Sequence, residues 1–152
     1  MQAAIVWTWE AKPVWDEKLS LRGNGRSNSR VESCLNVFMP LLGTYRELND
    51  VGVVDFDGKL TLGEGTAMLR RMVREMISGG KRKILLNLAG VSYIDSAGIG
   101  ELVSSYMTVR ANGGEMKLVQ LTKNVHDIIQ ITRLFTIFDI QSDEATAIGS
   151  FR

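Results

Sequence analysis

Residues that build disulfides and metal centres are almost absent from this sequence. Its 152 residues include one cysteine, Cys34, and one histidine, His126. No disulfide can form within a single chain, and a metal ion would find only scattered carboxylates as ligands. The sequence also has no apolar run near the ~20 residues that span a bilayer, and its N-terminus lacks the basic and apolar regions of a secretory signal. These absences predict a cytoplasmic protein without a membrane partner.

Neither sign of charge dominates the chain. There are 18 basic and 17 acidic side chains, which give a formal net charge of +1. Such a balance provides no broad positive field to gather nucleic-acid phosphates. Hydrophobic residues make up 45% of the chain and charged residues 23%, values that are typical of ordinary globular proteins. We therefore expect one compact domain and no nucleic-acid partner.

The composition changes near Met39. Before it, the stretch Arg22–Ser33 is rich in Gly, Asn, Ser and Arg and shows neither helical nor strand periodicity. We expect residues 1–38 to form a flexible or appended leader and residues 39–152 to form the folded domain. Two interpretations of the tryptophans in the leader stay open, anchoring of a partner or incidental residues of an appended or mistranslated segment. These tryptophans are Trp7, Trp9 and Trp15.

From Thr44 onward, short apolar runs alternate with amphipathic stretches, which predicts an α/β domain in the order β-β-α-β-α-β-α-β-α. The predicted strands are Thr44–Leu48, Gly52–Phe56, Ile84–Leu88, Met116–Leu121 and Phe138–Ile140. The predicted helices contain Met68–Ile77, Ile99–Tyr106, Thr122–Arg133 and a last segment that Ser142 would cap and that runs through Ile148.

Local signals fix several details of this pattern. Asn49-Asp50 predicts a tight turn between the first two strands, and Asp57-Gly58 predicts a bend after the second. Methionines at helical spacing (Met68, Met72 and Met76) fit either an adaptable binding groove or a core stripe, and the spacing favours core. The almost unbroken apolar run Ile84–Leu88 predicts a central strand that is covered on both faces.

Enzyme signatures are incomplete. Gly58-Lys59-Leu60 lacks the upstream glycine and the hydroxyl of a phosphate-binding loop, and Gly98-Ile99-Gly100 lacks the third glycine of a dinucleotide fingerprint. Ser96 follows a strand as a nucleophile elbow would, but Ile94 stands where that motif requires glycine. The only histidine base, His126, falls on a different predicted helix, where a surface position is expected. These departures weaken the hypothesis of a serine hydrolase.

The turn Asp95-Ser96 is the remaining candidate for function. Either side chain can cap the following helix, and this structural role alone would justify both residues. The functional interpretation is that Ala97, Gly98 and Gly100 keep the surrounding surface small, so that another protein can approach the Ser96 hydroxyl. A kinase could then reach this serine.

The segment Leu85–Gly100, with the sequence LLNLAGVSYIDSAGIG, resembles the central signature of STAS domains, specifically of bacterial anti-sigma factor antagonists. The resemblance covers about Thr44 to Phe151. It includes Phe56–Leu60 as an early strand and turn and Phe135–Ile140 as the last strand. It implies an α/β fold with a central mixed β-sheet of about five strands, flanked by about four helices.

The resemblance also implies a function in partner switching. The unphosphorylated antagonist would bind an anti-sigma factor serine kinase and so free a sigma factor. Phosphorylation of Ser96 would end that interaction, and a serine phosphatase would reset it. The implied partner-binding residues are Asp95, Ser96, Ala97, Gly98 and Gly100. The chain itself would catalyse nothing and need no cofactor. Two alternatives stay open, a structural subunit of a stress-sensing scaffold and a hydrolase that uses Ser96.

Overall fold

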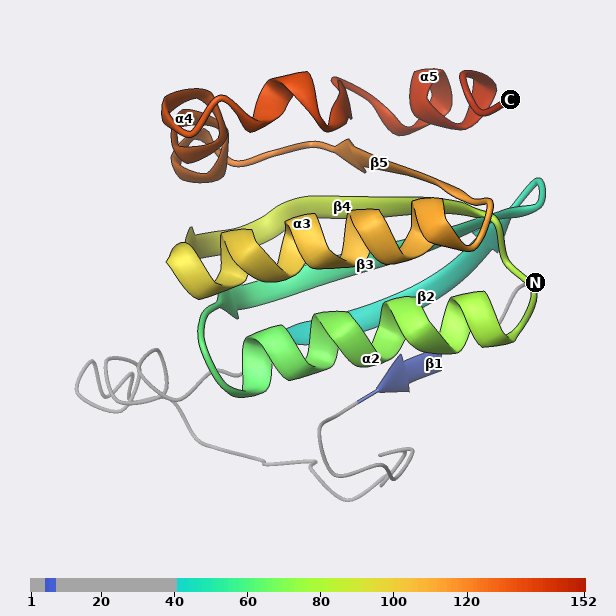
Figure 1. The fold of residues 1–152 in the computed structure, drawn as a ribbon, viewed down its shortest axis with the longest axis horizontal. Coiled ribbons are helices and arrows are strands. Elements are labelled where there is room, and N and C mark those ends of the chain that lie inside the picture. Colours follow the sequence, from blue (N-terminus) through green and yellow to red (C-terminus); the bar gives the residue numbers. More distant parts are fainter. Residues whose placement is uncertain (1–4, 8–40) are drawn as a thin grey trace, which may run out of the picture.

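The computed structural model describes residues 41–152 and the backbone of Ile5–Trp7 (Figure 1). Its strands are β1 (Ile5–Trp7), β2 (Leu42–Leu48), β3 (Val51–Leu60), β4 (Lys83–Ile94), β5 (Glu115–Val119) and β6 (Asp139–Gln141). Its helices are α2 (Glu64–Ser78), α3 (Ser96–Ala111), α4 (Lys123–Ile131), the 3-10 helix η1 (Leu134–Thr136) and α5 (Glu144–Gly149). Apart from β1, the predicted leader and its boundary at Met39 lie outside the described residues.

One mixed sheet carries the fold, with the strands in the order β1-β2-β3-β4-β5-β6. The pairs β1/β2 and β2/β3 are antiparallel, and the remaining neighbours are parallel. Strands β2 to β6 correspond to the five predicted strands, and β1 adds a sixth at the edge of β2. The predicted α/β order and the mixed sheet are confirmed.

The antiparallel part follows from its turn residues. Leu48 pairs with Val51 across a two-residue turn, and both turn residues take a positive φ, 48° at Asn49 and 71° at Asp50. Such backbone matches the twist of a hairpin and favours Asn and Asp. The predicted end of the second strand at Phe56 is wrong, since β3 continues to Leu60, although its register with β4 shifts on either side of Asp57-Gly58.

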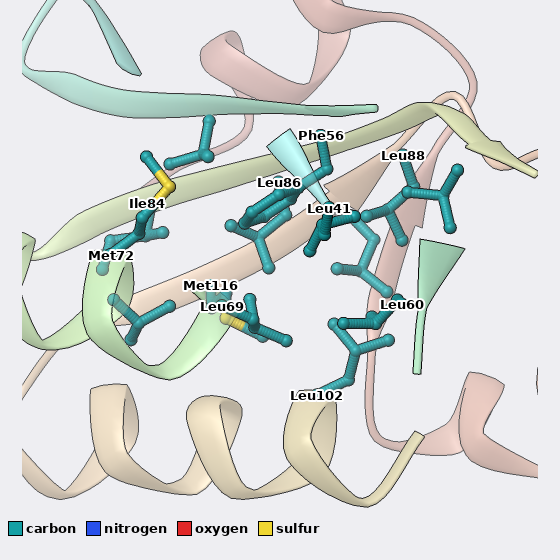
Figure 2. Close-up of a cluster of buried hydrophobic side chains, with 14 of the residues drawn as sticks. Leu41, Phe56, Leu60, Leu69, Met72, Ile84, Leu86, Leu88, Leu102 and Met116 are labelled. Carbon is teal, nitrogen blue, oxygen red and sulfur yellow. The ribbon is translucent and has the colours of Figure 1, made fainter. Parts of the chain in front are cut away.

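The main core lies between the sheet and the helices α2 and α3, which lie side by side in Figure 1. In Figure 2, Leu69 and Met72 of α2 and Leu102 of α3 face side chains of the strands. The methionines of α2 are buried, with exposed fractions of 4 to 6%, which confirms their assignment to the core. Ile84, Leu86 and Leu88 belong to this cluster, and Leu85 packs into a second cluster on the other face. The prediction of a central strand covered on both faces is therefore confirmed.

The second face of the sheet is covered by the short helix α5. Ala147 of α5 packs against Val51, Val53, Leu85 and Val119. Arg46 of β2 links the helix to the sheet, because its guanidinium forms ion pairs with Asp55 of β3 (2.5 Å) and with Glu144 of α5 (2.6 Å). The C-terminal segment is thus held to the antiparallel edge of the sheet by a polar clamp as well as by its small apolar core.

Two predictions near the C-terminus are wrong. Phe135 lies in η1 and not in the last strand, which is Asp139–Gln141. Ser142 does not cap the last helix, since the side chain of Asp143 occupies the capping position and accepts from Thr146 N at 2.9 Å. The preceding helix α4 ends at Ile131, before Arg133 takes a left-handed φ of 57°. Among the helices of the described residues, none combines the length and apolar character needed to cross a membrane.

Candidate functional site: the Ser96 turn

The candidate site lies where β4 ends and α3 begins. Ile94, the last residue of β4, is 2% exposed and anchors the strand in the core. Asp95 follows as the N-cap residue, and Ser96 is the first residue of α3. Ser96 is exposed to solvent. A short step thus takes the chain from a buried strand to an accessible hydroxyl at the start of a helix.

Asp95 holds this turn together with both carboxylate oxygens. Gly98 N donates to Oδ1 at 2.7 Å, and Leu62 N, in the loop between β3 and α2, donates to Oδ2 at 3.0 Å. These backbone donors, Leu62 first and then Gly98, lower the pKa of the Asp95 carboxyl because they favour its charged form. The sequence left the capping residue open between Asp95 and Ser96. The structure gives the cap to Asp95.

The glycines of the turn differ in their surroundings. A Cβ added to Gly98 would lie 2.2 Å from the carbonyl oxygen of Leu60 and 2.8 Å from Ile94 Cγ1. Gly98 therefore lets α3 approach the end of β3, and it is buried. Gly100 has nothing within 4 Å of such a Cβ and is exposed. Of the residues singled out from the sequence, Ser96 and Gly100 are exposed, and Ala97 is half-buried.

Two exposed apolar side chains flank the turn. Leu62 is 77% exposed although its backbone amide is bonded to Asp95, and Tyr93, near the end of β4, is 51% exposed. Sequence reasoning missed both residues. Leu62 stands alone in a polar loop, and Tyr93 looks like one member of an apolar strand. Tyr93 precedes Ser96 by three residues in the chain, whereas Leu62 reaches the turn through its tertiary bond to Asp95.

The strand before the turn is fixed from two sides. Ser92 Oγ donates to Gly58 O of β3 at 3.3 Å. On the other side, Thr122 Oγ1 donates to Val91 O at 2.8 Å, and Asn124 Nδ2 donates to Ser92 O at 3.2 Å. These bonds tie β3, β4 and the start of α4 together a few residues before the Ser96 turn.

The geometry gives no support to a Ser96 hydrolase. His126 lies exposed on α4, as expected, where its ring contacts Gln130 (3.4 Å) and Asp127 (3.9 Å). Within the described residues, no hydrogen bond or ion pair joins it to Ser96. The residues described here also contain no group of three or more His, Cys, Asp and Glu side chains placed to hold a metal ion.

Comparisons with known proteins agree with this arrangement. The family model of the STAS domain matches residues 44–147. The anti-sigma-B factor antagonist of Bacillus subtilis is 30% identical over 94 residues, which cover 62% of this chain and 84% of that protein. The crystal structure of the candidate anti-sigma factor antagonist TM1081 from Thermotoga maritima superposes with a TM-score of 0.66 at 27% identity, over 71% of this chain and 92% of that one.

A third comparison shows the fold alone. SpoIIAA, the Bacillus cell fate determinant, has a structure in its phosphorylated form that is similar at a TM-score of 0.56 and 19% identity, over 70% of this chain and 96% of that one.

Since the STAS model covers most of the described domain, the chain belongs to the STAS-domain family. Within that family, it belongs with the bacterial anti-sigma factor antagonists.

Proposed function

We propose that this chain is an anti-sigma factor antagonist controlled by phosphorylation of Ser96. In the cytoplasm, its unphosphorylated form binds an anti-sigma factor that is also a serine kinase, and a sigma factor is released. The observation that carries the proposal is the exposed Ser96 hydroxyl at the first position of α3, on a helix whose cap is supplied by Asp95. The cap does not need the serine, so the hydroxyl is available for modification.

The contact surface combines small and apolar groups. A partner can approach the turn closely because its side chains are small, at Ser96, Ala97 and Gly100. The exposed side chains of Leu62 and Tyr93 offer apolar area for burial. Tyrosine is one of the residue types that are enriched at the positions that dominate binding energy in protein interfaces. Asp95 and Gly98 contribute by shaping the turn, through the carboxylate bonds and the close helix approach described above.

A phosphate at Ser96 would act on the interface and leave the fold intact. It adds about −1.5 to −2 charges at neutral pH. At the start of α3 this charge meets the positive end of the helix dipole, so the free domain tolerates it. A partner surface fitted to a hydroxyl and to apolar neighbours would have to desolvate the phosphate, and we expect a loss of about 3 kcal/mol, ~100-fold in affinity.

The same logic assigns the remaining roles. The partner kinase supplies the chemistry and the nucleotide, and a serine phosphatase restores the hydroxyl. The antagonist acts by binding and performs no catalytic step.

Calorimetric titration of the kinase partner, captured from its native cytoplasm, tests the proposal. Wild type and Ser96→Ala are expected to bind alike, and Ser96→Ala is expected to resist inactivation by ATP. Ser96→Asp should bind more weakly, and the phosphoprotein should lose about 100-fold. Ser104→Ala, at an exposed serine farther along α3, is the matched control and should behave as wild type.

Two outcomes would contradict the proposal. Equal affinity of all forms, with no phosphate incorporated at Ser96, would leave this serine as an ordinary surface residue. Large stable self-assembly on sizing, without kinase binding, would favour the alternative of a scaffold subunit.

A further inference from the structure

A basic cavity lies at the end of the sheet opposite the Ser96 turn. It has a volume of about 650 Å³ and is lined by residues at the start of β4 and β5, the end of α3 and the C-terminal segment. In Figure 1 this is the region where α3 ends and β5 begins. Five basic side chains line it against two acidic ones, Glu115 and Asp139. The basic residues are Arg82, Lys83, Arg110, Lys117 and Arg152.

Lys117 is a buried lysine of the cavity lining and pairs with both of its acidic residues. Its side chain is only 3% exposed, and its ammonium bonds Asp139 Oδ2 at 2.6 Å and lies 3.3 Å from Glu115 Oε1. The ammonium also donates to the carbonyl and hydroxyl oxygens of Ser150, at 3.1 and 2.8 Å. Both carboxylates therefore have Lys117 as a partner, although Asp139 (46% exposed) and Glu115 (30% exposed) still reach solvent.

Three of the basic side chains that line the cavity keep their positive charge available. Within residues 41–152, Arg82, Lys83 and Arg110 form no ion pair with a carboxylate. Arg82 Nη1 donates to Ile77 O and Lys81 O, both at 3.2 Å, which fixes its guanidinium beyond the end of α2. Its other N–H groups remain available to a ligand.

Helix ends account for only part of this charge. Arg82 lies beyond the C-terminus of α2 and Arg110 in the last turn of α3, where a cation offsets the negative end of the helix dipole. Each helix end is equivalent to about half a negative charge. The excess of basic over acidic side chains is larger than the two helix ends balance, and it converges on one concave surface.

We propose that this cavity binds a small molecule that carries a phosphate group, with the phosphate held by Arg82, Lys83 and Arg110. The planar fork of arginine matches phosphate oxygens in pairs. The volume falls in the range of about 300 to 1,000 Å³ that is usual for small-molecule sites. The concave shape favours a compact anion over an extended acidic segment of a protein.

A glycine pair, Gly113 and Gly114, is part of the cavity lining. Gly113 has a φ of 73°, which disfavours other residues, and a Cβ on Gly114 would lie 2.8 Å from the carbonyl oxygen of Arg82. The turn between α3 and β5 can therefore lie close to Arg82 without side chains that would fill the space.

NMR titration of the full chain at low ionic strength tests the proposal, with inorganic pyrophosphate and a phosphorylated sugar as probes. Amide shifts are expected at Gly113, Gly114 and Lys83. The double variant Arg82→Gln/Arg110→Gln should weaken binding at least about tenfold. The control Arg74→Gln/Lys123→Gln removes two charges from exposed positions outside the cavity and should change affinity less than about twofold.

The comparison of probes refines the ligand. Equal affinities would show that phosphate alone is recognised, and tighter binding of the sugar phosphate would show additional contacts. Equal weakening by the control variant, or shifts confined to other surfaces, would overturn the proposal. So would tighter binding of a hexaglutamate peptide, which would assign the surface to an acidic protein. Arg110→Gln alone, on the exposed last turn of α3, repeats the test if the double variant does not fold.

Discussion

The two ends of helix α3 lie at opposite ends of the parallel strands β4 and β5 and differ in chemistry. At its N-terminus, around Ser96, backbone donors hold one carboxylate, and apolar side chains are exposed. At its C-terminus, near Arg110, the buried Lys117 pairs with the part-exposed Asp139, and further basic side chains line a cavity. Shape and apolar area dominate the first end, and charge dominates the second.

This difference follows from the direction of the strands and helices. Loops after the carboxyl ends of parallel strands are the usual sites of function in open α/β sheets, and the Ser96 turn follows the carboxyl end of β4. At the amino ends of β4 and β5, the helices α2 and α3 terminate. Their negative dipole ends favour arginine nearby, so a basic surface arises there with little disturbance to the core.

The largest expected change in stability concerns Gly98 and Gly100, at the N-terminal end of α3. Gly98→Ala should destabilise the domain by about 1 to 3 kcal/mol, because the added carbon meets the backbone of Leu60. Gly100→Ala should stabilise it by about 0.5 to 1 kcal/mol, because alanine favours a helix and the space is open. Chemical denaturation measures both.

Partner binding separates the roles of these glycines. Gly100→Ala should weaken kinase binding although the domain is more stable, because it adds bulk to the proposed contact surface. A destabilised Gly100→Ala, or a Gly98→Ala as stable as wild type, would show that the described packing of α3 is wrong.

Periodicity and turn residues were enough to predict most of the fold. The buried methionines of α2, the central run in β4 and the Asn49-Asp50 hairpin turn each have a local signal that the structure confirms. The failures at Phe135 and Ser142 have local causes as well. An aromatic residue followed by apolar ones fits a strand and a 3-10 turn alike, and Ser142 and Asp143 are adjacent capping residues, between which the backbone selects.

The candidate site was predictable only in part. Asp95 and Ser96 stand in one motif, so the sequence located the turn. Which of the two residues caps α3 depends in part on the bond from Leu62 N to Asp95, 33 residues apart in the chain. Such a contact leaves no trace in the periodicity of the sequence. The basic cavity was invisible for the same reason, since the net charge of +1 conceals a local gathering of cations from four separate segments.

A smaller effect is expected at the second end. Lys117→Met should destabilise the domain by about 1 to 3 kcal/mol, because Asp139 and Glu115 lose their shared cation. The loss should fall in the lower part of this range, because both carboxylates can still reach water. Asp139→Asn combined with Lys117→Met should recover part of this loss. Denaturation of the four proteins in the double-mutant cycle gives the coupling energy. Additive effects would show that the ion pair between Lys117 and Asp139 contributes nothing.

The smallest effect concerns acid stability at the first end. Asparagine in place of Asp95 has one acceptor oxygen, so it can satisfy Gly98 N or Leu62 N but not both. Asp95→Asn should therefore cost about 1 kcal/mol at neutral pH, a value usual for a weakened cap. The folded-state pKa of Asp95 is lowered, so its stabilisation is fully present above the unfolded pKa of about 3.9 and is lost as pH falls through the folded pKa. The difference in stability between wild type and Asp95→Asn should shrink below about pH 4. The control Asp127→Asn, at an exposed position on α4, should match wild type at neutral pH.

The pKa of Asp139 is also lowered, first by its bond to Lys117, so acid sensitivity from the C-terminal end of α3 should persist in Asp95→Asn. Urea denaturation at a series of pH values measures both contributions, and a wild-type minus variant difference that stays constant down to pH values of about 2 would show that the carboxylate of Asp95 does not hold the turn through its charge.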